Sequence, residues 1–124
     1  MTDKVVDASA FAAAAFLEKE AAAIEGRLAG HQLFAPSLLR YEMANICRRK
    51  LSQSPSDRTT ILGQFLSSHD VALQLQDVDF VEVVELAGQL NLTAYDASYL
   101  WLARSLSAEL VTLDEKLDRA AKAI

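Results

Sequence analysis

The sequence predicts an α/β domain in which helices cover both faces of a parallel sheet. Short apolar runs of strand length alternate with helical patterns along the chain, and this order favours parallel strands joined by crossover helices. The length of 124 residues is that of one domain, so we interpret residues 1–124 as a single unit. A hydrophobic content of 52% is sufficient for one sheet with helices packed on it.

The first elements are a strand and two helices. Lys4–Val6 is a short run with two β-branched residues that ends abruptly at Asp7, as a buried strand does at its carboxyl end. Residues 8–16 are rich in alanine, the strongest helix former. A second helix is expected over residues 18–28, with Gly30 as its end.

A second strand and a long helix are expected next. The apolar run Gln32–Ala35 predicts a buried strand that Pro36 stops. Ser37 is expected to cap a helix that continues to about Leu51. Glu42 lies at the border of the apolar stripe of this helix, so we expect it at the edge of the buried surface.

The middle of the chain predicts a loop, two helices and a third strand. Ser52–Asp57 is rich in serine and contains a proline, which is typical of a loop. A helix is expected over residues 58–68. Val71–Gln76 alternates apolar and polar residues, as a strand does. Asp77 is expected to start a helix that continues to about Leu90.

The last elements are a buried helix, a strand and a short helix. Residues 93–107 are apolar on nearly every face of a helix, which is typical of a helix packed among other elements. Glu109–Leu113 predicts a fourth strand that ends at Asp114. Residues 115–124 are expected to form the final helix.

Four acids occupy positions where parallel strands end and helices begin. Asp7 and Asp114 each follow a strand, and Asp96 lies in the first turn of the apolar helix. Because strand ends and the starts of the following helices share one edge of a parallel sheet, these three are expected there, with Glu42 leaning over it. Each acid also has a structural interpretation. Asp7 and Asp114 could be N-caps, Asp96 could complete a capping box with Thr93, and Glu42 could pair with an arginine.

Converging carboxylates require a cation. Like charges within a few ångströms raise one another's pKa and reduce stability. Mg²⁺ and Mn²⁺ relieve this repulsion, and both prefer carboxylate and water oxygens. Such a cation makes a bound water easier to deprotonate and stabilises charge on phosphate oxygens. The pattern therefore indicates hydrolysis of a phosphodiester by a metal-activated water.

Four motifs carry these acids, at Val5–Ala10, Leu39–Asn45, Leu92–Leu100 and Leu110–Leu117. In their order and spacing they resemble those of the PIN-domain ribonucleases, most closely the VapC-type toxins of bacterial and archaeal toxin–antitoxin pairs. The resemblance spans nearly the whole chain. It implies a three-layer α/β/α domain with a central parallel sheet of four to five strands. It also implies a Mg²⁺- or Mn²⁺-dependent endoribonuclease.

The resemblance also assigns roles to individual residues. Asp7, Glu42, Asp96 and Asp114 correspond to the acidic metal site of the family, and Asp7 and Asp96 are expected to be the direct ligands. Glu42 and Asp114 are expected to act through metal-bound waters. Many members carry a further acid where this chain has Lys116, which places a second metal position in doubt.

Two hydroxyl residues and one acid complete this assignment. Ser9 and Thr112 match hydroxyl positions that support the site in the family. Asp118 is a poorer match to the acidic positions, and we interpret it as a solvated helix residue.

The family also implies partners. Its members usually form homodimers and are inhibited by a cognate VapB-type antitoxin whose tail enters the active-site groove. Any DNA binding would belong to the complex with the antitoxin. The cluster of Arg40, Arg48, Arg49 and Lys50 could contact RNA phosphates or the antitoxin, or it could be an ordinary solvated helix end.

Composition excludes other classes of protein. The net charge of −5 argues against a large basic surface for nucleic acid. The single Cys47 cannot form an internal disulfide, no run is long enough to span a membrane and no signal peptide is evident, so a reducing cytoplasm is expected. His31 and His69 lack metal-ligand spacing. Tyr95, Tyr99 and Trp101 are expected in core or dimer packing.

Two alternative functions remain open from the residues. One is a PIN fold that has lost activity and serves as a binding module, although all four acids are intact. The other is a receiver-like domain that accepts a phosphoryl group. That chemistry needs paired acids after the first strand, whereas Asp7 is followed by alanine.

Overall fold

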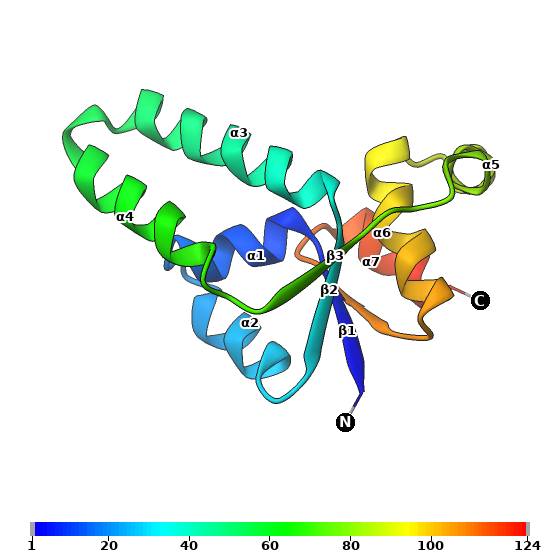
Figure 1. Ribbon diagram of the computed structural model, residues 1–124. Coiled ribbons are helices and arrows are strands. Elements are labelled where there is room, and N and C mark those ends of the chain that lie inside the picture. Colours follow the sequence, from blue (N-terminus) through cyan, green and yellow to red (C-terminus); the bar gives the residue numbers. More distant parts are fainter. Residues whose placement is uncertain (1, 124) are drawn as a thin grey trace.

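The structure is a computed structural model that describes residues 2–123 (Figure 1). Its four strands are parallel and form one sheet in the order β3-β2-β1-β4. This confirms the predicted α/β class and the parallel sheet, with four strands among the described residues. The strands are β1 Asp3–Val6, β2 Gln32–Pro36, β3 Leu73–Gln76 and β4 Glu109–Val111.

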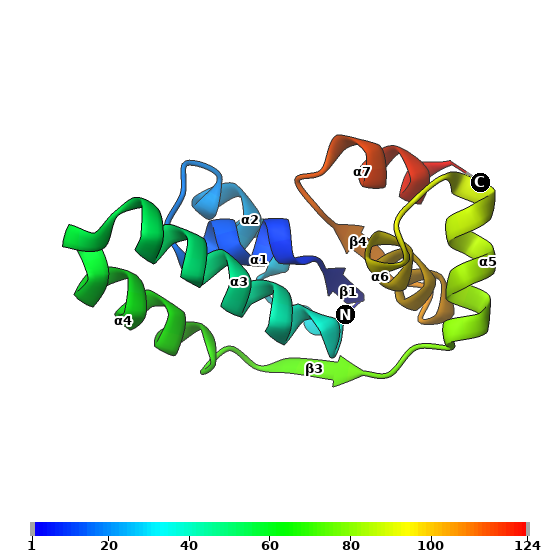
Figure 2. The ribbon, with the colours of Figure 1, turned by 90° about the horizontal axis from the view of Figure 1, so that it is seen from above.

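Helices cover both faces of the sheet. Figures 1 and 2 show α1 to α4 on one side and α5 to α7 on the other, with α3 and α4 extending beyond the sheet as an antiparallel pair. The helices are α1 Ala8–Ala15, α2 Ala21–Leu28, α3 Leu38–Gln53, α4 Arg58–Ser68, α5 Phe80–Leu90, α6 Ala94–Ser105 and α7 Glu115–Lys122, with a 3₁₀ turn η1 at Pro55–Asp57. None of these helices is long and apolar enough to cross a lipid bilayer.

The strand order reverses at β1. The chain moves from β1 outward to β2 and β3, and then crosses back to place β4 on the other side of β1. Ligands of open α/β sheets bind in the crevice that such a reversal leaves at the carboxyl ends of the strands. Val6 pairs with Val111, and the backbone N–H of Asp7 donates to the carbonyl of Val111 at 3.1 Å. The residues that follow β1 and β4 are therefore adjacent.

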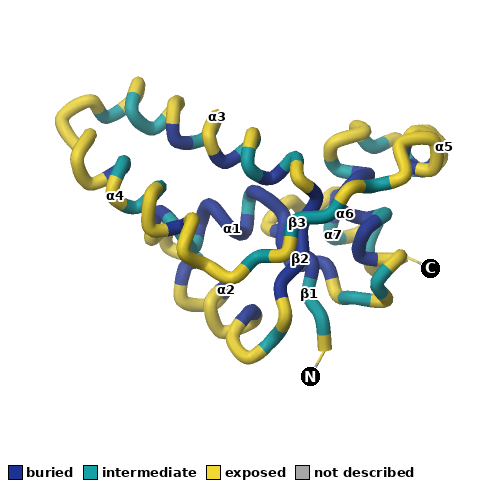
Figure 3. The backbone as a smooth tube through the Cα atoms, in the orientation of Figure 1, coloured by how far each residue is buried: buried dark blue, intermediate teal, exposed yellow. Residues whose placement is uncertain are grey.

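Small and β-branched residues form the centre of the core. Val5, Val6 and Val111 are fully buried, as is Ala10 at the start of α1. Alanine side chains allow α1 to lie close to its neighbours, which explains why an alanine-rich helix follows β1 directly. Figure 3 shows the buried residues concentrated along the central strands, α1 and α6, whereas α4 and α5 are mostly exposed.

Two helices begin later than the sequence predicts. The helix expected from residue 18 begins at Ala21. The backbone of Leu17 is left-handed, with a φ of 52°, and the chain turns between Leu17 and the start of the helix. The helix expected from Asp77 begins at Phe80, because the side chain of Asp79 accepts from the backbone of the first turn and is the N-cap.

Three other local expectations are wrong in detail. The side chain of Ser37 makes no capping hydrogen bond, and its backbone is already helical. The loop expected at Ser52–Asp57 is shorter, because α3 continues to Gln53 and η1 follows. The last strand ends at Val111.

Candidate active site

Asp7 is the most enclosed of the four predicted acids. It follows β1 and is 5% exposed. Its Oδ1 accepts from the backbone N–H of Ala10 at 3.0 Å and from the hydroxyl of Ser9 at 2.7 Å, and its Oδ2 accepts from the hydroxyl of Thr112. Asp7 is therefore the N-cap of α1 and an acid at the carboxyl edge of the sheet, so the structural and functional interpretations hold together.

The two supporting hydroxyls have fixed orientations. The Oγ of Ser9 accepts from the backbone N–H of Leu113, and the Oγ1 of Thr112 accepts from the backbone N–H of Asp114, each at 3.0 Å. Each hydroxyl also donates its own proton to the carboxylate of Asp7. This network joins the end of β4 to the end of β1.

Asp114 lies at the start of α7. Its Oδ1 accepts from the backbone N–H of Leu117 at 2.8 Å, which makes it the N-cap of that helix. Asp114 is exposed, and its other carboxylate oxygen has no protein partner within residues 2–123. The residue keeps one oxygen for a ligand while it caps the helix.

Glu42 and Asp96 are half-buried acids on helices from opposite faces of the sheet. Oε1 of Glu42 accepts from the hydroxyl of Tyr99 at 2.5 Å. No arginine pairs with Glu42 in the described part of the chain, so the alternative interpretation as a surface ion pair is not supported. The backbone N–H of Asp96 donates to the hydroxyl of Thr93 at 3.1 Å, which is one half of the expected capping box.

Sequence reasoning missed Tyr99 as a residue of this site. It was expected in core or dimer packing, and it is indeed 1% exposed, but its hydroxyl contacts an acid 57 positions away. Tyr99 follows Asp96 by three residues, and residues three apart lie on the same face of a helix. This spacing alone predicts that Tyr99 lies on the same side of its helix as the acid. Tyr95, in contrast, is 62% exposed, so it lies outside the core, and dimer packing stays a prediction for it.

The acids lie within electrostatic range of one another. Burial raises the pKa of Asp7, hydrogen bonds from Thr112, Ala10 and Ser9 oppose this, and the charge of Asp114 adds to it. Burial also raises the pKa of Tyr99.

The two helical acids respond to the same charges. Burial raises the pKa of Glu42, the hydrogen bond from Tyr99 opposes this, and the charges of Asp7 and Asp96 raise the pKa further. The pKa of Asp96 is raised by burial and by Asp114 and Asp7, while Lys116 lowers it. The structure thus brings the four predicted acids together at one edge.

The donor set fits a divalent cation. None of the ion pairs within residues 2–123 neutralises any of the four acids. As the side chains stand, no three acidic, histidine or cysteine groups in that range are close enough to bind a metal together. Mg²⁺ keeps several waters and needs only one or two direct carboxylates, so a loose cluster of oxygen donors suits it.

The predicted basic residues lie along α3. Arg48 and Arg49 are exposed, and Arg40 is partly exposed. Arg49 lines a polar hollow of about 350 Å³. Ser9 and Leu113 also line it, as do the acids Glu18 and Glu20, but none of the four predicted acids does. Lys50 lines it too, but its Nζ lies 3.2 Å from a carboxylate oxygen of Glu18.

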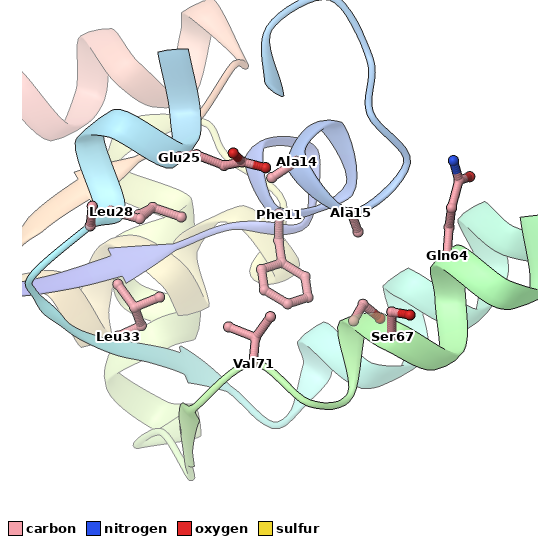
Figure 4. Close-up of a pocket in the computed structure, with 11 residues that line it drawn as sticks. Phe11, Ala14, Ala15, Glu25, Leu28, Leu33, Gln64, Ser67 and Val71 are labelled. Carbon is pink, nitrogen blue, oxygen red and sulfur yellow. The ribbon is translucent and has the colours of Figure 1, made fainter. Parts of the chain in front are cut away.

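An apolar hollow lies elsewhere, among α1, α2 and α4 (Figure 4). It encloses about 380 Å³, and the side chains of Phe11, Leu33 and Val71 point into it. Glu25 is the one acid in its lining. This hollow is a place for apolar groups and is separate from the acidic edge.

Comparison with known proteins identifies the class. Residues 4–123 match the model of the PIN domain family. The chain belongs to this family, whose members are generally metal-dependent nucleases. The crystal structure of PAE2754 from Pyrobaculum aerophilum is similar, with 29% sequence identity and a TM-score of 0.80 over 99% of this chain and 88% of that chain. No curated protein matches the chain.

Proposed function

We propose that this chain is a metal-dependent endoribonuclease that serves as the toxin of a toxin–antitoxin pair. One observation carries the proposal. Four acids from four separate elements lie within electrostatic range of one another near the reversal point of the sheet, and none forms an ion pair among the described residues, in a member of the PIN domain family. A site of this kind binds a divalent cation and a phosphate, and an RNA phosphodiester is the proposed substrate.

Each residue has a distinct role in this proposal. Asp7 and Asp96 would hold Mg²⁺ or Mn²⁺ directly, and Glu42 and Asp114 would act through its waters. When bound, such a cation stabilises charge on phosphate oxygens and lowers the pKa of water. The two hydroxyls on Asp7 keep its carboxylate in place for this purpose.

The basic residues of α3 support binding of RNA. Phosphate contacts supply most of the affinity of proteins for nucleic acid, and a chain of net charge −5 needs local cations to make them. Arg49 lines a polar hollow that is also lined by Ser9, whose hydroxyl donates to Asp7, and Arg48 is exposed on the same helix. We propose that these residues, with Arg40, contact the phosphates next to the cleaved bond or an antitoxin that replaces the RNA.

The proposed protein partners are a VapB-type antitoxin and a second copy of this chain. The apolar hollow of Figure 4 offers an antitoxin a place for apolar side chains. For a homodimer, the support is an exposed apolar surface of Tyr41, Phe80, Val84 and Tyr95, which are 62–78% exposed and line one hollow of about 360 Å³. DNA binding is proposed only for the complex with the antitoxin.

Cleavage of total cellular RNA by the purified protein tests the proposal. The reactions contain Mg²⁺, Mn²⁺ or excess EDTA, and the control is the Asp96→Asn variant. We expect discrete fragments that require metal and that are absent with the variant. The fragments also identify the RNA that is cleaved.

The second candidate is a PIN fold that binds a partner without catalysis. Folded protein, shown to be free of antitoxin, that cleaves no RNA with either metal would favour this alternative. Membership of the PIN domain family leaves the receiver-like alternative without support.

A further inference from the structure

Glu42 is held differently from the acids that follow strands. Asp7 and Asp114 accept hydrogen bonds from backbone N–H groups at the starts of α1 and α7. Glu42 lies beyond the first turn of α3, where backbone N–H groups are already bonded within the helix. Within residues 2–123, the one hydrogen bond to its carboxylate comes from the hydroxyl of Tyr99.

The bond between Tyr99 and Glu42 crosses the carboxyl edge of the sheet. Tyr99 lies on α6 and Glu42 on α3, and these helices cover opposite faces (Figure 2). The hydroxyl donates to Oε1 over 2.5 Å, and Tyr99 is 1% exposed. Its ring is therefore fixed by packing. Because the bond uses only Oε1, the other oxygen of Glu42 remains for a ligand.

A purely structural need does not explain why the acceptor is an acid. A buried tyrosine hydroxyl requires an acceptor, and a backbone carbonyl suffices. The neighbouring Ser98 is also buried, and its hydroxyl donates to the carbonyl of Ala94 in its own helix at 2.7 Å. Tyr99 instead contacts a carboxylate of the acidic cluster, and hydrogen bonds to charged acceptors are the stronger kind.

We propose that Tyr99 is a positioning residue of the cation site: its hydroxyl holds Oε1 of Glu42 and keeps the second carboxylate oxygen available to the waters of the cation. The inference rests on the proposed function, because it concerns the same site. Because Tyr99 lies on α6, the packing of that helix would influence metal affinity, although Tyr99 itself is not a metal ligand.

Calorimetric titration with Mn²⁺, without RNA, tests the inference independently of activity. The Tyr99→Phe variant keeps the ring and loses only the hydroxyl, and Ser98→Ala is the matched control for a buried hydroxyl on the same helix. Partners that hydrogen-bond a ligating group contribute about ten- to a hundredfold to metal affinity. We expect Tyr99→Phe to weaken Mn²⁺ binding about tenfold. We expect Ser98→Ala to leave it unchanged.

A double-mutant cycle separates positioning from packing. In a Glu42→Ala background, Tyr99→Phe should have no further effect on Mn²⁺ affinity, because the group it positions is gone. If Tyr99 only stabilises the core, Tyr99→Phe lowers the melting temperature and leaves Mn²⁺ affinity unchanged in both backgrounds, and the inference is wrong.

A second variant keeps the test decisive if Tyr99→Phe does not fold. Glu42→Asp keeps the charge but shortens the side chain, so its carboxylate cannot contact both Tyr99 and the cation site. We expect this variant to bind Mn²⁺ as weakly as Glu42→Gln, and wild-type affinity would overturn the inference. If Asp7→Asn abolishes Mn²⁺ binding while Tyr99→Phe and Glu42→Asp bind Mn²⁺ like wild type, the inference is wrong and the proposed function remains. A wild type that binds no Mn²⁺ would overturn both proposals.

Discussion

Asp7, which follows a strand, and Glu42, which lies on a helix, are built into the site in opposite ways. Asp7 is surrounded by donors from its own turn and from the adjacent end of β4, within a few residues of the strand pair Val6 and Val111. Glu42 depends on one hydroxyl from a helix 57 residues later. The first arrangement has three donors at the paired ends of β1 and β4, whereas the second has a single donor from a helix on the other face of the sheet.

This difference indicates which interactions tolerate change. A carboxylate with three donors keeps its orientation when one of them is lost, although the remaining buried charge becomes more costly. When the only donor to a carboxylate is lost, as Tyr99 is for Glu42, the side chain regains its rotational freedom. We therefore expect stability to depend mainly on the groups around Asp7, and the geometry of metal binding to depend on both regions.

The largest effect is expected for Asp7→Asn. The amide can still cap α1, but it removes the charge proposed to hold the cation. We expect metal-dependent cleavage to fall by more than about a hundredfold, because even partners of metal ligands contribute up to that amount. Circular dichroism is expected to show an intact fold. Cleavage at the wild-type rate by the folded variant would show that the site is assigned wrongly.

Thr112→Val tests the redundancy around Asp7. Valine has nearly the same shape as threonine but lacks the hydroxyl that donates to Oδ2. Because Asp7 is buried, loss of this donor is expected to reduce the free energy of unfolding by about 1–3 kcal/mol. Urea unfolding measures this loss. A variant as stable as wild type would mean that the other donors compensate fully.

The contribution of Asp7 to the free energy of unfolding is expected to depend on pH. Burial raises its pKa above the ordinary value of 3.8, so the folded state binds more protons than the unfolded state just above that value. The contribution of Asp7 to the free energy of unfolding is therefore present below pH 3.8 and is lost as the pH rises through the raised pKa.

Urea unfolding of wild type and Asp7→Asn in EDTA, at a series of pH values, measures this contribution. The stability of wild type relative to the variant should fall with rising pH and then become constant. Added Mg²⁺ should restore wild type selectively at high pH, because it binds the ionised acids of the folded state. A pH-independent difference in EDTA would contradict the raised pKa.

The local region of the site could be predicted from the sequence. A strand that ends in aspartate and continues into an alanine-rich helix indicates both the edge of the sheet and the cap. The parallel order followed from the alternation of elements, and Asp7 and Asp114 lie where that order places them. Ser9 and Thr112 were assigned by resemblance, and both contact Asp7.

The long-range features could not be predicted in the same way. No periodicity indicates that the hydroxyl of Tyr99 meets Glu42, because that contact depends on how α6 and α3 pack across the sheet. Helix starts were also misplaced. The pattern of apolar residues encodes neither the side-chain cap of Asp79, which sets the start of α5, nor the left-handed backbone of Leu17, which precedes α2.

The smallest expected effect concerns Lys116, whose charge acts on the helical acid Asp96. Its Nζ donates to the carbonyl of Asn91, the left-handed residue that ends α5, and its charge lowers the pKa of Asp96. A fixed positive charge near a cation site opposes binding of the metal. Lys116→Met should therefore tighten Mn²⁺ binding about two- to fivefold, the size of an exposed charge interaction. The same calorimetric titration measures this change, with Lys122→Met as the control because Lys122 pairs with Asp118 instead. Weaker binding in Lys116→Met would mean that the lysine supports the site through its bond to the end of α5 rather than opposing the metal.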